Sequence, residues 1–340
     1  MLLVAALAAC GDGSSASELV GAGASSQSAA IDGWKAGFAE RANDVSVAYD
    51  PIGSGGGREL FLDGGADFAG SDVALDDDEM HAGVERCDGT DGAINLPVFV
   101  SPIAVVYNLP ELGSQPLRLT GELVAAIFAG SIERWDDPRL AAINPGVALP
   151  NRPLNAVHRS DESGTTKNFT AYLDAVAPGE WSYGVIESWD EGPRNGEGAD
   201  GTSGVVESVR VGVGSIGYAE ASQIGALPAA AIEVGGTFVE YSPEAAAAVL
   251  TASTRTPGRS PNDFTYDIRR DVPGTYPIVL VSYHIACVHY DDADTARRVR
   301  EFLTYVVSAE GQDVAHATAG TAPLPRPLAE QLAAAIATIA

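Results

Sequence analysis

The feature that most constrains the fold is a repeated order of strand, glycine-rich turn and helix near the start of the chain. Residues 19–43 contain a short apolar strand, the turn GAGASS and a helical face formed by Ile31, Trp34 and Phe38. Residues 45–61 repeat this order with the strand VSVAY and the turn IGSGGG. A helix between two strands carries the chain back over the sheet, so that the strands run in the same direction. The sequence therefore predicts an α/β protein with a largely parallel sheet.

Two long apolar segments divide the rest of the chain. Residues 93–107 and 276–288 are both long enough to run between two lobes, and we expect them to pair as hinge strands. Residues 190–204, rich in Gly, Asp and Glu, predict a loop before a short helix at 205–209. A chain of 340 residues can form two hydrophobic cores. We expect a tether at residues 1–18, a first lobe from residues 19–106 and 284–340, and a second lobe from residues 107–283.

The formal net charge of −26 excludes some partners but not an anionic ligand. A strongly acidic surface repels nucleic acid and anionic membrane surfaces, so we expect no nucleic-acid partner. Salt screens exposed charges beyond about 8 Å, so surface carboxylates have little influence inside a closed cleft. A buried site is governed by its own hydrogen bonds. The net charge is therefore compatible with a site for a small anion.

The three cysteines are informative through their positions. The apolar stretch before Cys10 is similar to a bacterial lipobox, in which the cysteine is lipidated and becomes the mature N-terminus; the alternative is a chance apolar start. This stretch is short and lacks basic residues, so we expect the true start codon to lie upstream. Export implies an oxidising compartment, in which Cys87 and Cys287 form either a disulfide or two buried thiols. We expect an extracytoplasmic protein anchored to the cell membrane as a lipoprotein.

Three segments place a hydroxyl at a predicted helix start. They are Ala24-Ser25-Ser26, Gly53-Ser54-Gly55 and Ser163-Gly164-Thr165. A helix start offers unpaired N–H groups and the positive end of the helix dipole, which together bind anions. Each segment alone is an ordinary helix cap, but three that converge would surround a tetrahedral oxyanion. Arg159 adds a bidentate cation, and Asp161 is placed to orient its guanidinium.

Asp72 indicates which oxyanion the site would select. It follows Gly70-Ser71 at the predicted end of a strand. A carboxylate repels a fully ionised anion such as sulfate, but it accepts a hydrogen bond from a protonated one such as monohydrogen phosphate. A buried acceptor without a donor costs a few kcal/mol, enough for strong discrimination. The alternative is that Asp72 only caps the following turn.

Enzyme functions have little support in the sequence. We find no nucleophile elbow, no phosphate-binding Gly-x-x-x-x-Gly-Lys loop and no His-Glu-x-x-His zinc motif. The five histidines show no metal-ligand spacing. We therefore expect no catalytic residue, no metal and no cofactor. An exported phosphatase-like enzyme is kept as an alternative.

Taken together and in order, the motifs resemble those of the extracytoplasmic phosphate-binding proteins of bacterial ABC phosphate importers. The segments that carry the resemblance are GAGAS at 21–25, IGSGGG at 52–57, DFAGSD at 67–72, IFAGSI at 127–132, WDDP at 135–138, NPG at 144–146, RSDESGT at 159–165, IGY at 216–218 and APLP at 322–325. The resemblance implies a two-lobed periplasmic-binding-protein fold of type II-like architecture, in which each lobe is a mixed sheet flanked by helices.

The resemblance also implies a ligand set. The implied phosphate donors are Ser25, the backbone of Ser26, Ser54, Arg159, Ser163, Gly164 and Thr165; the implied acceptor is Asp72, and Asp161 orients the arginine. The main departure comes after Ser25, where the family's familiar form has Thr-Phe and this chain has Ser25-Ser26-Gln27. If only the backbone N–H of residue 26 is used, the function is retained. If Ser26 also offers its hydroxyl, the site gains a donor and its selectivity could differ.

The sequence therefore predicts a monomeric lipoprotein that binds inorganic phosphate, and arsenate more weakly, and delivers phosphate to a membrane permease. The alternatives are a receptor for another oxyanion such as sulfate or molybdate, the phosphatase-like enzyme, and a sensor or adhesive surface protein of the same fold.

Overall fold

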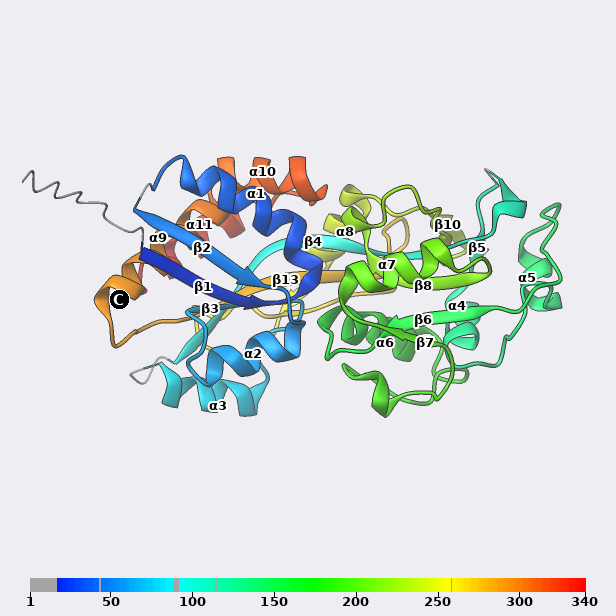
Figure 1. Ribbon diagram of the computed structural model, residues 1–340, viewed down its shortest axis with the longest axis horizontal. Helices are drawn as coiled ribbons and strands as arrows, with labels where there is room; N and C mark the ends of the chain where they lie inside the picture. The colour runs from blue at the N-terminus through cyan, green and yellow to red at the C-terminus, as the bar shows by residue number, and fades with distance from the viewer. Residues whose placement is uncertain (1–16, 43, 88–91, 114, 258) are drawn as a thin grey trace, which may run out of the picture.

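The computed structural model describes residues 17–42, 44–87, 92–113, 115–257 and 259–340. Cys10 and almost all of the predicted tether lie outside these residues. The molecule is elongated, with β1, β2 and β3 in one half, β6, β7 and β8 in the other, and β4 and β13 between them (Figure 1). We call the half that contains β1 the first lobe and the half that contains β6 the second lobe.

One eight-stranded sheet extends through both lobes, in the order β2-β1-β3-β13-β4-β8-β6-β7. β1, β2 and β3 are parallel to one another, as are β6, β7 and β8, whereas β4 and β13 run antiparallel to their neighbours. Each lobe therefore has a mixed sheet, as predicted. The strands are β1 Ser17–Gly23, β2 Val45–Asp50, β3 Phe68–Ser71, β4 Ala93–Tyr107, β6 Asn155–Arg159, β7 Glu197–Ala199, β8 Ser215–Glu220 and β13 Val279–Cys287.

β4 connects the two lobes because its two ends pair with different strands. Its first part pairs with β13, from Ala93 opposite Cys287 to Pro102 opposite Val279. Its last five residues pair with β8. All 15 residues of β4 are buried, which explains the continuous apolar sequence. The predicted pairing of the two long apolar segments is confirmed.

In the first lobe α1 packs on α10 and β2, α2 packs on β1 and β3, and α11 packs on α9. α1 buries Ile31, Trp34 and Phe38, the face predicted from their spacing. The helices are α1 Ser28–Ala39, α2 Ser54–Leu62, α3 Asp77–Arg86, α9 Ala293–Val307, α10 Ala309–Ala319 and α11 Arg326–Ile336, with a 3-10 turn, η1, at Ser25–Gln27.

In the second lobe α7 packs on β6 and β8, α4 packs on α6, and α8 packs beside β4. The helices are α4 Gly121–Phe128, α5 Pro138–Ile143, α6 Gly164–Val176, α7 Gly201–Val211 and α8 Pro243–Ala252, with 3-10 turns η2 Pro110–Leu112, η3 Trp189–Glu191 and η4 Ala221–Gln223. Short strands make two small sheets: β5 Arg118–Leu119, β9 Ala231–Val234, β10 Thr237–Val239, β11 Thr254–Arg255 and β12 Tyr266–Asp267.

The loop predicted for residues 190–204 is wrong in its second half. β7 lies within it, and α7 begins at Gly201 rather than near residue 205. The strand forms because β7 pairs with β6, a tertiary contact that outweighs the poor strand propensity of its sequence EGA.

Cys87 and Cys287 are joined by a disulfide whose Cα atoms are 5.1 Å apart. It ties the end of α3 to the end of β13, two segments separated by 200 positions in the chain. Within the described ranges, no helix combines the length and the apolar character needed to cross a bilayer.

Candidate functional site

The predicted oxyanion-binding residues meet at one buried position between the lobes, around Asp72. Asp72 follows β3 in the first lobe and is only 3% exposed. Its Oδ2 accepts hydrogen bonds from Ser26 Oγ at 2.6 Å and from Thr165 Oγ1 at 2.9 Å. Its backbone N–H donates to Ser54 Oγ at 3.1 Å. A Cβ added at Gly164 would lie 2.6 Å from Ser54 Oγ, so no larger residue fits there.

The first hydroxyl-bearing segment is a 3-10 turn rather than the first turn of an α-helix. Ser25 and Ser26 lie in η1, and α1 begins only at Ser28. Ser25 Oγ accepts a hydrogen bond from the backbone N–H of Thr202, at the start of α7, over 3.0 Å. The hydroxyl of Ser26 has a partner in the protein itself. It donates to Asp72 and so supports the acceptor.

The second segment depends on a glycine at position 53. Gly53 has φ 93°, a value that favours glycine, and a Cβ there would lie 2.6 Å from Asp161 Oδ2. This conformation brings the start of α2 close to the loop after β6. Ser54 then begins α2 beside Asp72. The glycine is needed both for the turn and for the close approach of the two lobes.

Arg159 and Asp161 form a buried ion pair in the second lobe. Arg159 Nε donates to Asp161 Oδ1 at 2.6 Å, and Nη2 donates to Oδ2. Burial acts to raise the pKa of Asp161, but the hydrogen bonds and charge of Arg159 outweigh it and hold that pKa below its ordinary value. Asp161 Oδ1 also accepts from the backbone N–H of Gly201 at 3.1 Å. The guanidinium is thus held in a fixed orientation, as the sequence predicted.

Ser163 acts as a helix cap, and the same helix start contributes to the site. Its Oγ accepts from the backbone N–H of Thr166 at 3.2 Å, at the start of α6. The next hydroxyl, that of Thr165, reaches across to Asp72. The cap and the anion-site interpretations of this segment are therefore compatible.

Two opposing effects set the pKa of Asp72. Burial raises the pKa, whereas hydrogen bonds from Ser26, Ser282 and Thr165 and the charge of Arg159 lower it. The net effect is a raised pKa. The carboxylate accepts three hydroxyl hydrogen bonds from the protein itself, and its role as the acceptor for a protonated oxyanion remains a prediction.

Sequence reasoning missed four polar residues near Asp72 and the 25–26 turn: Ser282, Thr202, Asn168 and Gln223. Ser282 lies on β13, whose pairing with β3 places it beside Asp72. The predicted hinge strand was the only signal for it. Thr202 lies in the first turn of α7, a helix whose start the sequence placed too late.

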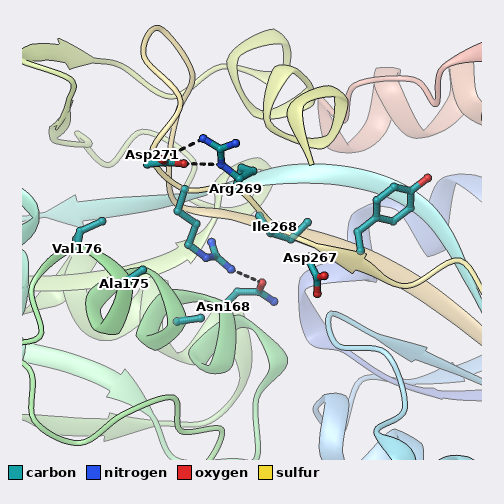
Figure 2. Close-up of a pocket in the computed structure, with 10 residues that line it drawn as sticks. Asn168, Ala175, Val176, Asp267, Ile268, Arg269 and Asp271 are labelled. Atoms are coloured by element: carbon teal, nitrogen blue, oxygen red, sulfur yellow. Dashed lines mark hydrogen bonds and ion pairs between the residues drawn. The ribbon is translucent and has the colours of Figure 1, made fainter. Parts of the chain in front are cut away.

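The pocket in Figure 2 is separate from the predicted site. It has a volume of about 560 Å³, and none of the predicted ligand-binding residues lines it. Among the described residues there is also no group of three or more His, Cys, Asp or Glu side chains that could hold a metal ion.

Comparison with known proteins identifies the family. The model of the PBP superfamily domain matches residues 8–310. The phosphate-binding protein PstS 3 of Mycobacterium leprae is 37% identical over 328 residues, which cover 95% of this chain and 87% of the relative. The chain belongs to the PstS family of phosphate-binding proteins. A more distant PstS, from Methanocaldococcus jannaschii, is 31% identical and covers 88% of this chain and 80% of its own.

Solved structures agree with the two-lobed PstS fold. A phosphate-binding protein from Stenotrophomonas maltophilia superposes with a TM-score of 0.75 at 21% identity, covering 94% of this chain and 93% of that one. A putative phosphate ABC transporter substrate-binding protein from Clostridium perfringens, solved with bound phosphate, superposes with a TM-score of 0.65 at 18% identity, covering 89% and 98%. At these identities the likeness concerns the fold, and the predicted fold class is confirmed.

Proposed function

We propose that this protein binds inorganic phosphate between its two lobes and delivers it to an ABC permease for import. One observation carries the proposal: a buried acceptor carboxylate, Asp72, lies among the hydroxyls of both lobes. Such a carboxylate favours an oxyanion that still carries a proton, and phosphate carries one at neutral pH. Membership of the PstS family supports the same ligand.

The proposed ligand set combines donors from both lobes with one acceptor. Arg159 supplies the charge, and the starts of α2 and α6 supply hydroxyl and backbone N–H groups. The full set is Ser25, Ser26, Ser54, Asp72, Arg159, Ser163, Gly164 and Thr165, with Asp161 as the orienting carboxylate.

The remaining assignments are part of the same proposal. The chain would be exported, lipidated at Cys10 and monomeric, and it would bind arsenate more weakly than phosphate. The lobes would divide at residues 106–107 and 283–284, close to where β4 changes its pairing partner and where β13 pairs with β3. The protein would have no enzymatic activity of its own.

Titration calorimetry with phosphate, arsenate, sulfate and molybdate tests the ligand. We expect phosphate to bind tightly, arsenate more weakly, and sulfate and molybdate not to bind measurably. Sulfate binding as tight as phosphate would contradict the role of Asp72. A phosphate-ester hydrolysis assay, with and without a chelator, tests the phosphatase alternative; turnover above the chelated control would favour the enzyme.

A further inference from the structure

Two side-chain amides of the second lobe reach the main chain of the first lobe at the segments that carry the predicted ligand residues. Asn168 lies on α6, and Gln223 lies in η4. Asn168 contacts the carbonyl of Asp72, and Gln223 contacts the carbonyls of Ser25 and Ser26. We call these two residues the amide clamp.

Asn168 joins both lobes through one NH₂ group. Its Nδ2 donates to the carbonyl oxygen of Asp72 at 2.8 Å and to that of Gly164 at 3.0 Å. Its Oδ1 accepts from Arg270 Nη2 at 2.9 Å, the hydrogen bond drawn at Asn168 in Figure 2. All polar atoms of the amide therefore have partners, and two of those partners belong to predicted ligand residues.

Arg270 fixes which way the amide of Asn168 faces. A guanidinium only donates, so the amide oxygen must face it and the NH₂ group must face the two carbonyls. Arg270 is 8% exposed and also donates to the carbonyls of Pro277 and Val279. Burial lowers its pKa to about 10, so it remains charged at neutral pH. No ion pair is formed by Arg270 within the described part of the chain.

Gln223 holds the other predicted ligand segment in the same manner. Its Nε2 donates to the carbonyl of Ser25 at 2.9 Å and to that of Ser26 at 3.0 Å. The turn that carries Gln223 is fixed by Glu220, which caps η4 by accepting from the backbone N–H of Ser222 at 3.1 Å. The backbone of the turn that carries Gln223 is thus held in place by this cap.

We propose that the amide clamp consists of positioning residues that hold the lobes closed over bound phosphate and slow its release. The NH₂ groups of the two side chains donate to carbonyl oxygens of the first lobe. These interlobe hydrogen bonds form only when the two lobes are in contact. An interaction present only in the closed complex lowers the dissociation rate and leaves the encounter with ligand largely unchanged. This inference rests on the proposed function.

The test uses substitutions that keep the shape and remove the donor. In Asn168→Asp and Gln223→Glu, a carboxylate oxygen replaces the NH₂ group and faces two carbonyl oxygens. Asn108→Asp is the matched control, because Asn108 Nδ2 also donates to two carbonyls, at 3.0 and 2.9 Å, but both belong to residues of α7 in its own lobe. Stopped-flow kinetics and calorimetry with inorganic phosphate then compare each variant with the wild-type protein.

We expect Asn168→Asp and Gln223→Glu each to raise the phosphate dissociation rate about tenfold or more, while the association rate changes less than about threefold. Asn108→Asp should lower the melting temperature and leave the dissociation rate within about twofold of wild type. Dissociation rates within twofold of wild type in both clamp variants would overturn the inference. Should Asn168→Asp not fold, Gln223→Glu decides alone. Absence of phosphate binding by the wild-type protein would instead contradict the proposed function.

Discussion

Ser282 donates its hydroxyl proton to Oδ1 of Asp72 over 2.8 Å. Ser282 lies on β13 and Asp72 follows β3, and these antiparallel strands are neighbours in the sheet. The other carboxylate oxygen accepts from Ser26 and Thr165. Strand pairing in the sheet thus brings a third donor to a carboxylate that already accepts from the 3-10 turn η1 and from the start of α6.

Substitution of this serine should move the pH dependence of phosphate binding. Removing a donor from an ionised carboxylate raises its pKa. As the pH is lowered, we therefore expect Ser282→Ala to lose phosphate affinity at a higher pH than the wild-type protein does. Because a hydrogen bond to a charged group is lost, the free energy of unfolding near pH 8 should fall by roughly 1.5–3 kcal/mol. Calorimetry between pH 4.5 and 8 measures the first effect and urea unfolding the second. Superimposable pH profiles would contradict this role.

Arg159→Ala should remove most of the phosphate affinity. The substitution deletes the cation that Asp161 holds in place, and loss of a charged bidentate contact corresponds to roughly a hundredfold or more in the dissociation constant. Calorimetry measures the loss, and circular dichroism checks that the fold is retained. Arg152→Ala, which removes a half-buried arginine paired with Glu111, is the control and should bind normally. Wild-type affinity in Arg159→Ala would remove Arg159 from the site.

Glu220 should make the protein less stable as the pH rises. Burial, opposed by hydrogen bonds from Ser101 and Ser222, raises its pKa to about 7 from 4.5. Between these two values the folded protein keeps a proton that the unfolded chain has released, so the free energy of unfolding falls as pH increases. The change amounts to about 3 kcal/mol. Glu220→Gln should lack this pH-dependent change. Between pH 4.5 and pH 7.5, the free energy of unfolding of the variant, measured with urea, should therefore rise relative to that of wild type by about 3 kcal/mol. A constant difference between the two proteins would contradict the assignment.

A buried ion pair between the lobes should contribute to closure. Arg58 of α2 donates to Glu187 of the second lobe at 2.8 and 3.1 Å. Burial acts to raise the pKa of Glu187, but Arg58 and Lys167 outweigh it and lower that pKa, so the contact stabilises the protein above the ordinary carboxyl pKa and weakens as pH falls. We expect Glu187→Gln to lower the free energy of unfolding by about 2 kcal/mol and to increase the radius of gyration in small-angle scattering.

The matched control is Glu79→Gln. Glu79 also accepts from Arg58, at 2.7 Å, but it lies on α3 in the same lobe. This variant should lose stability without a change in the radius of gyration. An equal radius in both variants would show that the pair with Glu187 does not act on closure.

The local sequence was sufficient for the elements that begin the site. Ser163 caps α6, in agreement with the helix start expected there, and Thr120 caps α4 in the same way, because a cap needs only a side chain and an N–H group three residues later. The buried strand β4 was also evident, since it is apolar along its whole length. The turn at Ser25 and Ser26 was located correctly but assigned to an α-helix. The same residue types begin a 3-10 turn and an α-helix, so the local sequence does not separate the two.

The sequence by itself determined the α/β fold class and most of the predicted ligand residues, because these depend on hydrophobic periodicity and on short motifs. Only the tertiary structure decided which other polar side chains form hydrogen bonds with these ligand residues. Ser282, Asn168 and Gln223 contact residues 210, 96 and 197–198 positions away. Each is a single residue in no motif, so its role depends on strand register and on how the lobes meet. Strand register and the contact between the lobes both depend on long-range packing. The residues next to each of these side chains in the sequence therefore do not predict its role.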